Sequence, residues 1–313
     1  MQPIEKIVVL GAGAMGAFYA ARFAATVGFK VQLLADPARA ALLKEHGLRI
    51  NHQTLKLPVN DGSRHQSAAD LVIVALKHHH LATGLPLLRK LVGPQTLFLS
   101  VLNGLDSEAL IAAEFGAERV LLCVAVGIDA VRTAEGIQVA HAGKLYFGES
   151  RNQPASPMVV KIQQALDRAG LAWETPADMQ RILWWKFMIN VGINQASAVL
   201  RAPYGVFQRC EAARAVITPL MEEVILLARR LEIDLGEADL EEWWRVLNRL
   251  APEGKTSMLQ DVEAGRPTEV EIFAGKVVAL GRELGIPTPA NAGILRIIRA
   301  LDVMAQEKIQ GGR

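Results

Sequence analysis

Three polar side chains share one face of an otherwise apolar stretch in the second half of the sequence. Lys186, Asn190 and Asn194 stand four residues apart, and apolar or small residues fill the positions between them. In a helix this spacing places the three side chains along one stripe. A buried polar group without a hydrogen-bonding partner costs roughly 2–7 kcal/mol. The stripe is therefore expected to line a cleft that holds a polar ligand. Alternatively, Lys186 pairs with a structural carboxylate and the two asparagines bridge helices.

A second polar group follows further along the chain. Ser257 stands at the start of a predicted helix, and Glu269 comes two residues after Pro267. Proline suits the first turn of a helix, so we expect Glu269 in that turn, where the helix dipole favours a carboxylate. Taken alone, both Ser257 and Glu269 also fit a role as helix caps.

A glycine-rich run near the start of the sequence indicates a dinucleotide site. The apolar residues 7–10 lead straight into this run, and an alanine-rich helical stretch follows it. In such a run the first glycine makes a tight turn, the second admits a pyrophosphate, and the third lets the helix pack on the strand. The first N–H groups of the helix then face the phosphates. The candidate cofactor ligands are Gly11, Ala12, Gly13, Ala14, Met15 and Gly16.

The choice between the two nicotinamide dinucleotides depends on a few charged residues. Asp36 lies 20 residues after Gly16, where an acid accepts hydrogen bonds from the adenosine ribose and repels a 2′-phosphate, which favours NADH. Asp36 also precedes Pro37 and fits equally well as a helix cap. Arg39 and Lys77 are cations near the expected cofactor edge. Arg39 is either a partner for a 2′-phosphate, which would favour NADPH, or a solvated helix arginine, so the sequence leaves the cofactor open.

These candidate residues require two kinds of scaffold. In the first half, short apolar runs alternate with helical patterns, which predicts crossover units and a mostly parallel, doubly wound sheet. We assign residues 1–177 to an α/β Rossmann domain that also contains a small β excursion at 47–61 and a hairpin at 136–148. The predicted strands are 6–10, 30–35, 71–76, 96–100 and 119–126, and the predicted helices are 14–27, 38–46, 80–92 and 106–114.

Beyond residue 176 the strand patterns stop and helical periodicity takes over. We assign residues 178–313 to an all-α domain. Its predicted helices are 181–197, 210–231, 237–250, 257–264, 267–284 and 290–306.

Composition excludes several classes of partner. The chain has 313 residues, 51% of them hydrophobic, and a net charge of +2, which indicates neither a nucleic-acid nor a membrane partner. The only cysteines, Cys123 and Cys210, stand alone, and no apolar run of about 18 residues or export leader is visible. We expect a cytoplasmic protein, a monomer or homodimer, with a small-molecule partner. His78, His79 and His80 are adjacent and cannot all face one ion, so no metal is expected.

Five motifs together resemble the ketopantoate reductase (2-dehydropantoate 2-reductase) family, in that family's order and over nearly the whole chain. They are the glycine run at 11–16, Leu102-Asn103-Gly104, Lys186-x3-Asn190-x3-Asn194, Ser257-Met258-Leu259-Gln260-Asp261 and Gly265-Arg266-x-Thr268-Glu269. The resemblance implies a Rossmann domain followed by a helical domain similar to those of 6-phosphogluconate dehydrogenase relatives. It also implies that NADPH reduces the ketone of 2-dehydropantoate, a 2-oxo acid, to (R)-pantoate.

The same resemblance implies a role for each candidate residue. Lys186 is the general acid that protonates the oxygen as hydride reaches carbon, and Glu269 anchors the substrate and the lysine network. Asn190, Asn194 and Ser257 hold the hydroxyl and carboxylate of the substrate. Asn103 lies between nicotinamide and substrate, which makes it a candidate for both cofactor and substrate binding. An ammonium donor of this kind stabilises the developing alkoxide.

The sequence departs from the family pattern at three places. Asp36 replaces a common arginine, which leaves NADH open as the cofactor, and Ile193-Asn194-Gln195 replaces Ile-Asn-Pro. The run at 268–275 lacks one of the usual asparagines. A reductase of another 2-oxo acid, or a non-catalytic dinucleotide-binding sensor, therefore remains an alternative.

Overall fold

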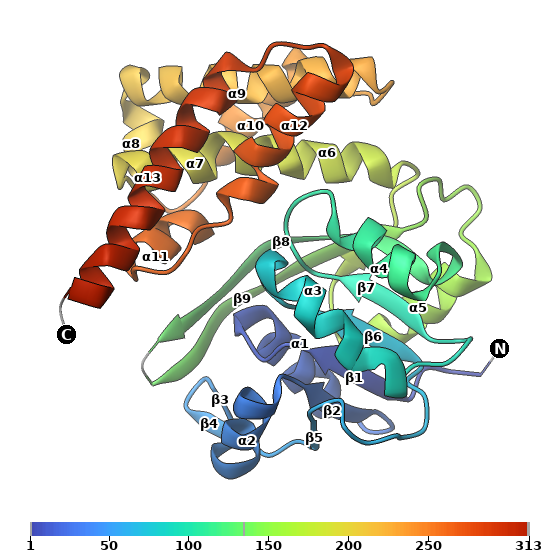
Figure 1. Cartoon of the computed structure of the whole chain (residues 1–313). Helices are drawn as coiled ribbons and strands as arrows, with labels where there is room; N and C mark the ends of the chain where they lie inside the picture. The colour runs from blue at the N-terminus through green and yellow to red at the C-terminus, as the bar shows by residue number, and fades with distance from the viewer. Residues whose placement is uncertain (1, 134, 312–313) are drawn as a thin grey trace. The chain divides into compact units, whose positions relative to one another are not determined.

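The computed structural model describes residues 2–133 and 135–311, with the side chains of residues 308–311 left out, and Figure 1 shows its elements. The chain divides into two compact units, Met1–Ile182 and Leu183–Arg313. The division falls inside helix α6 (Met179–Ile189). The boundary expected after residue 177 remains a prediction.

A mostly parallel sheet forms the centre of the first unit. Its strands are β1 (Lys6–Leu10), β2 (Lys30–Leu34), β3 (Leu48–Ile50), β4 (Gln53–Leu55), β5 (Val59–Asn60), β6 (Leu71–Val74), β7 (Leu97–Ser100), β8 (Val120–Thr133), β9 (Gly136–Gly148) and β10 (Trp173–Glu174). The parallel strands follow the order β5-β2-β1-β6-β7-β8, which is the 3-2-1-4-5-6 order of dinucleotide-binding folds. The predicted Rossmann domain is therefore confirmed.

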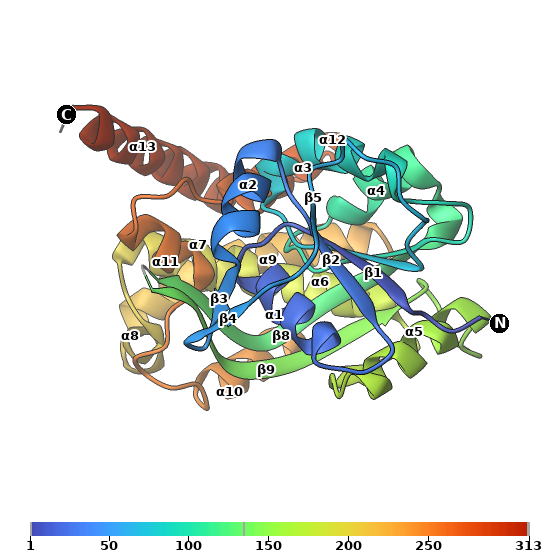
Figure 2. The same cartoon turned by 90° about the horizontal axis from the view of Figure 1, so that it is seen from below.

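The remaining strands extend this sheet on the β8 side. The long strands β8 and β9 pair antiparallel, β9 pairs in parallel with β3 and β10, and β3 pairs antiparallel with β4. The β excursion predicted at 47–61 contains β3, β4 and β5. The hairpin predicted at 136–148 is wrong, because these residues form the single strand β9, whose antiparallel partner is the preceding strand β8. Figure 2 shows β8 and β9 as a long ribbon beside α1 (Ala14–Ala24), with which both strands are in contact.

Helices cover both faces of the sheet, which explains why its central strands are apolar at every position. Ile7 and Val9 pack into a core with α1 and α5 (Pro157–Arg168). Val8 and Leu10 face the opposite core, which is shared with α3 (Leu81–Gly84) and α4 (Ser107–Phe115). Helix α2 (Pro37–His46) joins the first of these two cores.

The predicted helix 80–92 is wrong as a continuous element. The structure has a 3-10 helix at His78–His80, the single turn of α3, and a second 3-10 helix at Leu85–Lys90. Pro86 explains the difference, because proline has no N–H group for a helical hydrogen bond and its ring displaces the preceding turn.

The described residues of the second unit form helices joined by loops and contain no strand, as predicted for an all-α domain. Its elements are the end of α6, a one-turn π-helix at Asn190–Asn194 that we call the π-turn, α7 (Gln195–Leu200), α8 (Tyr204–Arg209), α9 (Glu211–Arg230), α10 (Glu237–Leu247), α11 (Ser257–Glu263), a 3-10 helix at Val270–Ile272, α12 (Ala274–Leu284) and α13 (Pro289–Gly311). Helix α9 contacts the π-turn, α12 and α13. In the described chain, no helix is both long and apolar enough to cross a membrane.

Two predicted helices of this unit need correction. The helix expected at 181–197 is interrupted by the π-turn, in which the backbone register widens to i+5. The helix expected at 267–284 begins only at Ala274. Consequently Glu269 does not lie in the first turn of an α-helix; it precedes the short 3-10 helix.

Candidate active site

The glycine turn between β1 and α1 has the geometry of a phosphate cradle. Gly11 has φ +98°, and a Cβ atom there would lie 2.6 Å from the carbonyl oxygen of Ala75. A Cβ at Gly16 would lie 2.0 Å from the carbonyl oxygen of Gly11, so this helix residue must also be glycine. A Cβ at Gly13, by contrast, would meet no protein atom within 4 Å. Packing therefore explains Gly11 and Gly16, whereas Gly13 borders open space that a ligand can fill.

The start of α1 completes this cradle. Gly13 is its N-cap residue and provides no side chain to accept hydrogen bonds from the first turn. The first N–H groups of a helix have no partners within the helix and carry a partial positive charge, which suits a pyrophosphate. The residues Gly11 to Gly16 thus fit the phosphates of a dinucleotide.

Two further candidate residues lie at the same edge of the sheet, directly after two of its strands. Strand β6 lies between β1 and β7, with Leu10 opposite Val74 and Val74 opposite Ser100. Lys77 follows β6 and Asn103 follows β7, and both side chains are partly buried. Ligands of doubly wound sheets bind at this carboxyl edge, where the strand order reverses between β1 and β6. The structure therefore brings Lys77 and Asn103 to the edge that carries the glycine turn.

Asp36 and Arg39 lie at the start of α2. The Asp36 carboxylate caps this helix and accepts a hydrogen bond from the N–H group of Arg39 at 2.9 Å. The pKa of Arg39 is lowered by partial burial and by the nearby charge of Arg132 on β8, and Asp36 opposes this shift. The structure therefore shows Asp36 as a helix cap, which is one of its two expected roles.

A buried polar network that the sequence did not reveal supports the loop of Asn103. The Ser100 hydroxyl donates to the Ser107 hydroxyl at 2.7 Å, and Ser107 donates to the Glu108 carboxyl group at 2.7 Å. The Ser100 hydroxyl oxygen also accepts a hydrogen bond from the backbone N–H group of Leu102 at 3.4 Å. Glu108 is buried, and desolvation raises its pKa to about 7.

Lys186 lies near the end of α6 in partly buried surroundings. Desolvation lowers its pKa to about 8. Within residues 2–133 and 135–311 no carboxylate, Glu269 included, pairs with its ammonium group. The described residues therefore do not form the structural ion pair that was considered for Lys186. A lysine with this pKa carries a proton at neutral pH and releases it more readily than an ordinary lysine does.

The π-turn brings the two asparagines of the stripe together. The side-chain amide of Asn194 donates to the amide oxygen of Asn190 at 3.4 Å, and both residues are buried. Gly192 allows the π-turn to approach α9 closely, because a Cβ there would lie 2.5 Å from Met221. Single turns of π-helix within α-helices occur frequently at functional sites.

Helix α7, directly after the π-turn, fixes the start of α11. The Thr256 hydroxyl donates to the Ser197 hydroxyl at 3.1 Å, and the Ser197 hydroxyl donates to the carbonyl of Ala202 at 2.8 Å. Thr256 also accepts the N–H group of Leu259 and so caps α11. Ser257 is the first residue of α11, and its side chain is exposed.

The segment before α12 carries the second candidate catalytic residue. Thr268 is held by Asp302 of α13, which accepts both the Thr268 hydroxyl at 2.7 Å and the Thr268 N–H group at 3.2 Å. Glu269 follows and is buried. Glu271, part of the run that departs from the family pattern, forms a two-point ion pair with Arg299 at the surface.

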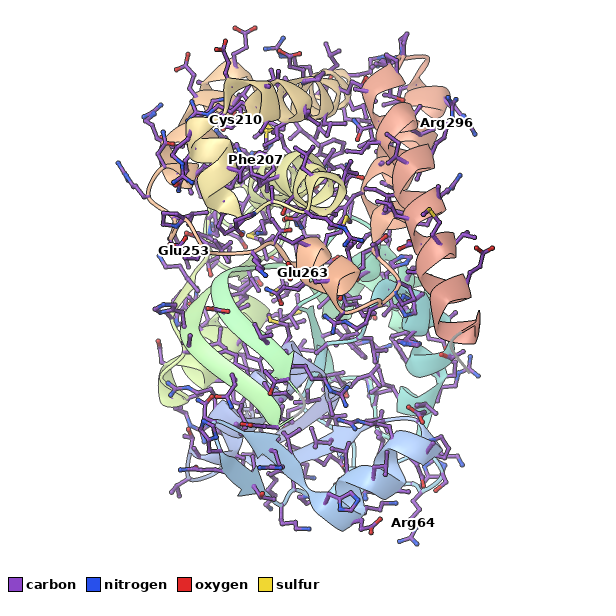
Figure 3. All side chains as sticks on the ribbon, turned by 90° about the vertical axis from the view of Figure 1, so that its left-hand side faces the viewer. Arg64, Phe207, Cys210, Glu253, Glu263 and Arg296 are labelled. Atoms are coloured by element: carbon purple, nitrogen blue, oxygen red, sulfur yellow. The ribbon has the colours of Figure 1, made fainter. Side chains whose placement is uncertain are left out.

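The histidine run and the two cysteines are the remaining residues considered for chemistry. His78 to His80 form the short 3-10 helix, and among the described residues no three histidine, cysteine, aspartate or glutamate side chains come together as metal ligands would. Cys123 is buried and Cys210, labelled in Figure 3 at the junction of α8 and α9, is exposed; both are free thiols.

Comparison with known proteins accounts for both halves of the chain. Residues 7–152 match the family model described as ketopantoate reductase PanE/ApbA, and residues 178–302 match the model of its C-terminal part. The chain belongs to the ketopantoate reductase family. As a ketopantoate reductase homologue it is an NAD(P)H-dependent oxidoreductase that acts on a ketone.

Individual relatives match this chain over nearly its full length. A 2-dehydropantoate 2-reductase from Halobacterium salinarum is 28% identical, with 94% of this chain and 98% of the relative covered. The solved 2-dehydropantoate 2-reductase of Geobacter metallireducens is 27% identical with a TM-score of 0.81, covering 94% of this chain and 99% of that one. The solved structure of D-mandelate dehydrogenase in complex with NADH has a similar fold, with a TM-score of 0.87 at 22% identity. The superposition covers 96% of this chain and 99% of the dehydrogenase chain.

Proposed function

We propose that this protein reduces 2-dehydropantoate to (R)-pantoate with NADPH and that Lys186 is the general acid. The observation that carries the proposal is the Lys186 ammonium group, which is desolvated, has no carboxylate partner among the described residues, and belongs to the helix that leads into the paired Asn190 and Asn194. The relatives named 2-dehydropantoate 2-reductase support this choice of substrate.

The proton step follows from the chemistry of a ketone. When bound, the dinucleotide would supply the hydride that the ketone carbon receives. As negative charge develops on the ketone oxygen, Lys186 donates a proton from Nζ to that oxygen and becomes a neutral amine. A positioned ammonium group stabilises this charge before the transfer is complete.

The other candidate residues bind and orient the substrate in this proposal. Asn190 and Asn194 carry amide groups that both donate and accept, which suits a hydroxyl and a carboxylate. Ser257 supplies an exposed hydroxyl at the start of α11, and Glu269 anchors the polar end of the substrate. Asn103 orients the nicotinamide from the carboxyl edge of the sheet.

The charges at the start of α2 support NADPH rather than NADH. Asp36 already accepts the N–H group of Arg39, so its carboxylate acts as a helix cap. Arg39 and Arg132 together raise the positive potential beside it. Two neighbouring guanidinium groups attract a 2′-phosphate, which can accept hydrogen bonds from both.

Steady-state rates with 2-dehydropantoate and a panel of simple 2-oxo acids, each with NADPH and NADH, test this proposal. We expect the highest kcat/KM for 2-dehydropantoate with NADPH. Turnover of another 2-oxo acid in preference to 2-dehydropantoate would overturn the substrate assignment, and a preference for NADH would overturn the cofactor assignment. No turnover with any acid, combined with dinucleotide binding, would instead identify a sensor.

A further inference from the structure

Gln195 immediately follows the π-turn and connects it to two other helices. Its side chain is completely buried. The amide nitrogen donates to the carbonyl of Val191 inside the π-turn at 2.6 Å and to the Asn291 side-chain oxygen at 3.4 Å. The amide oxygen accepts the N–H group of Ala274, the first residue of α12, at 3.0 Å. A single side chain thus joins the π-turn to α12 and α13.

The direction of this amide is fixed at both ends. Asn291 donates from its side-chain nitrogen to the Glu223 carboxylate at 2.7 Å and to the carbonyl of Leu220 at 3.1 Å. A carboxylate only accepts, so the Asn291 oxygen must point away from Glu223 and toward Gln195. At the other end, the backbone N–H group of Ala274 donates a hydrogen bond, so the atom of Gln195 that faces it must be the amide oxygen. A flipped amide would therefore lose hydrogen bonds on both sides.

Glu223 of α9 anchors the whole chain of hydrogen bonds. Its two oxygens accept the N–H groups of Ala290 at 2.7 Å and Asn291 at 2.9 Å, both in the first turn of α13. The carboxylate therefore lies at the positive end of that helix, where the dipole favours it. The order Glu223, Asn291, Gln195, Val191 runs from this anchor to the π-turn without a break.

The π-turn determines how Lys186 and Asn194 are rotated relative to each other. One residue corresponds to about 100° of rotation in an α-helix, so a register change at the π-turn would turn α7 by that amount relative to α6. We propose that Gln195 is a positioning residue: it holds the π-turn and thereby keeps the Asn190 and Asn194 amides directed at the 2-oxo acid. This inference rests on the proposed function of those two asparagines.

The variant Gln195→Met tests the proposal, because methionine has a similar length and no hydrogen-bonding amide. Gln208→Met is the matched control, since Gln208 is also in the second unit and its amide also donates to two carbonyls, those of Leu247 and Leu250, at 2.9 Å each. We expect Gln195→Met to lower kcat/KM for the 2-oxo acid at least tenfold while the NADPH Kd changes less than twofold. Gln208→Met should keep kcat/KM within threefold of the wild type, even if its thermal midpoint falls as far as that of Gln195→Met.

Gln195→Glu serves as a second variant if the methionine variant does not fold. Its carboxylate still accepts the N–H group of Ala274 but cannot donate to Val191 or Asn291, so we expect the same loss of kcat/KM. The proposal is overturned if Gln195→Met and Gln195→Glu lose no more kcat/KM than Gln208→Met does.

Hydrogen exchange separates this proposal from the proposed function. The backbone amides at 190–195 should exchange at least tenfold faster in Gln195→Met than in the wild type, and Gln208→Met should leave them unchanged. Unchanged exchange in Gln195→Met overturns the role of Gln195, whatever the substrate is. Faster exchange in a protein that reduces no 2-oxo acid retains Gln195 as the residue that holds the π-turn and rejects the proposed function.

Discussion

Asp36 accepts a hydrogen bond from the backbone N–H group of Arg39 at 2.9 Å and thereby caps helix α2, which is one of the two roles expected for this carboxylate. The same contact fixes the first turn of α2, where the Arg39 side chain emerges beside Arg132. The two residues that gave opposite indications about the cofactor are therefore parts of one local structure.

Replacing Arg39 should change cofactor preference. We expect Arg39→Gln to weaken NADPH binding at least tenfold, or about 1.4 kcal/mol, because a charged partner of the 2′-phosphate is lost. NADH binding should change less than threefold. Fluorescence titration with both dinucleotides measures this, and Arg89→Gln, at a surface ion pair with Glu114, is the control. An equal loss for NADH and NADPH would contradict a phosphate contact.

Replacing Asp36 should separate its role as a cap from its charge. Asp36→Ala removes the cap and should lower the free energy of unfolding by about 1 kcal/mol, whereas Asp36→Asn retains a capping oxygen and should lower it much less. Urea unfolding of both variants provides the measurement. Equal destabilisation by alanine and asparagine would mean that the charge, rather than the hydrogen bond, stabilises α2.

The glycine turn allows folding and binding to be tested separately. Gly13→Val introduces a side chain into open space, so we expect a folded protein that binds NADPH at least tenfold more weakly. Gly16→Ala places a Cβ against the carbonyl of Gly11 and should instead lower the thermal midpoint. Circular dichroism melting and dinucleotide titration distinguish the two effects. Full NADPH affinity in Gly13→Val would show that no ligand approaches this residue.

The Lys186 ammonium group should control the pH dependence of turnover. A general acid is active while it holds its proton, so kcat should be level below the pKa of about 8 and fall roughly tenfold per pH unit above it. Lys186→Met should lower kcat by about 10²–10⁴-fold. Pre-steady-state rates of NADPH oxidation between pH 6 and pH 10 give the profile, and Lys161→Met on α5 is the control. Wild-type activity that rises through pH 8 would exclude Lys186 as the acid.

Glu108 should make the stability of the first unit depend on pH. Its folded-state pKa of about 7 lies above the ordinary value of 4.5, so the neutral carboxyl group is favoured by folding. The associated stability is fully present below pH 4.5 and is lost as the pH rises through 7, by about 3 kcal/mol in total. Glu108→Gln removes this dependence, which urea unfolding at several pH values detects. Glu253→Gln, at an exposed carboxylate labelled in Figure 3, should retain it. Parallel pH curves for Glu108→Gln and the wild type would contradict the prediction.

The sequence predicts the parts of the fold that depend on local patterns. Runs such as Ile7 to Leu10 are apolar at every position because both faces of the sheet are covered, and glycines mark the turn whatever surrounds it. The π-turn has no comparable signal, because the residues packed against it or bonded to its end, Met221 of α9 and the partners of Gln195, are distant in the sequence. The prediction that Glu269 lies in the first turn of an α-helix was wrong for a related reason. Contacts such as Thr268 with Asp302 hold that segment outside a helix, and Pro267 alone does not reveal them.

The π-turn also restricts how substrate range can be engineered. Asn190 and Asn194 are bonded to each other, Gly192 has no room for a side chain against α9, and Gln195 is committed to α12 and α13. A mutant library directed at this turn would mostly yield unfolded or inactive proteins. Ser257 is exposed, and Thr256 rather than Ser257 caps its helix. Libraries at Ser257 should therefore change which acids are accepted while the protein remains folded.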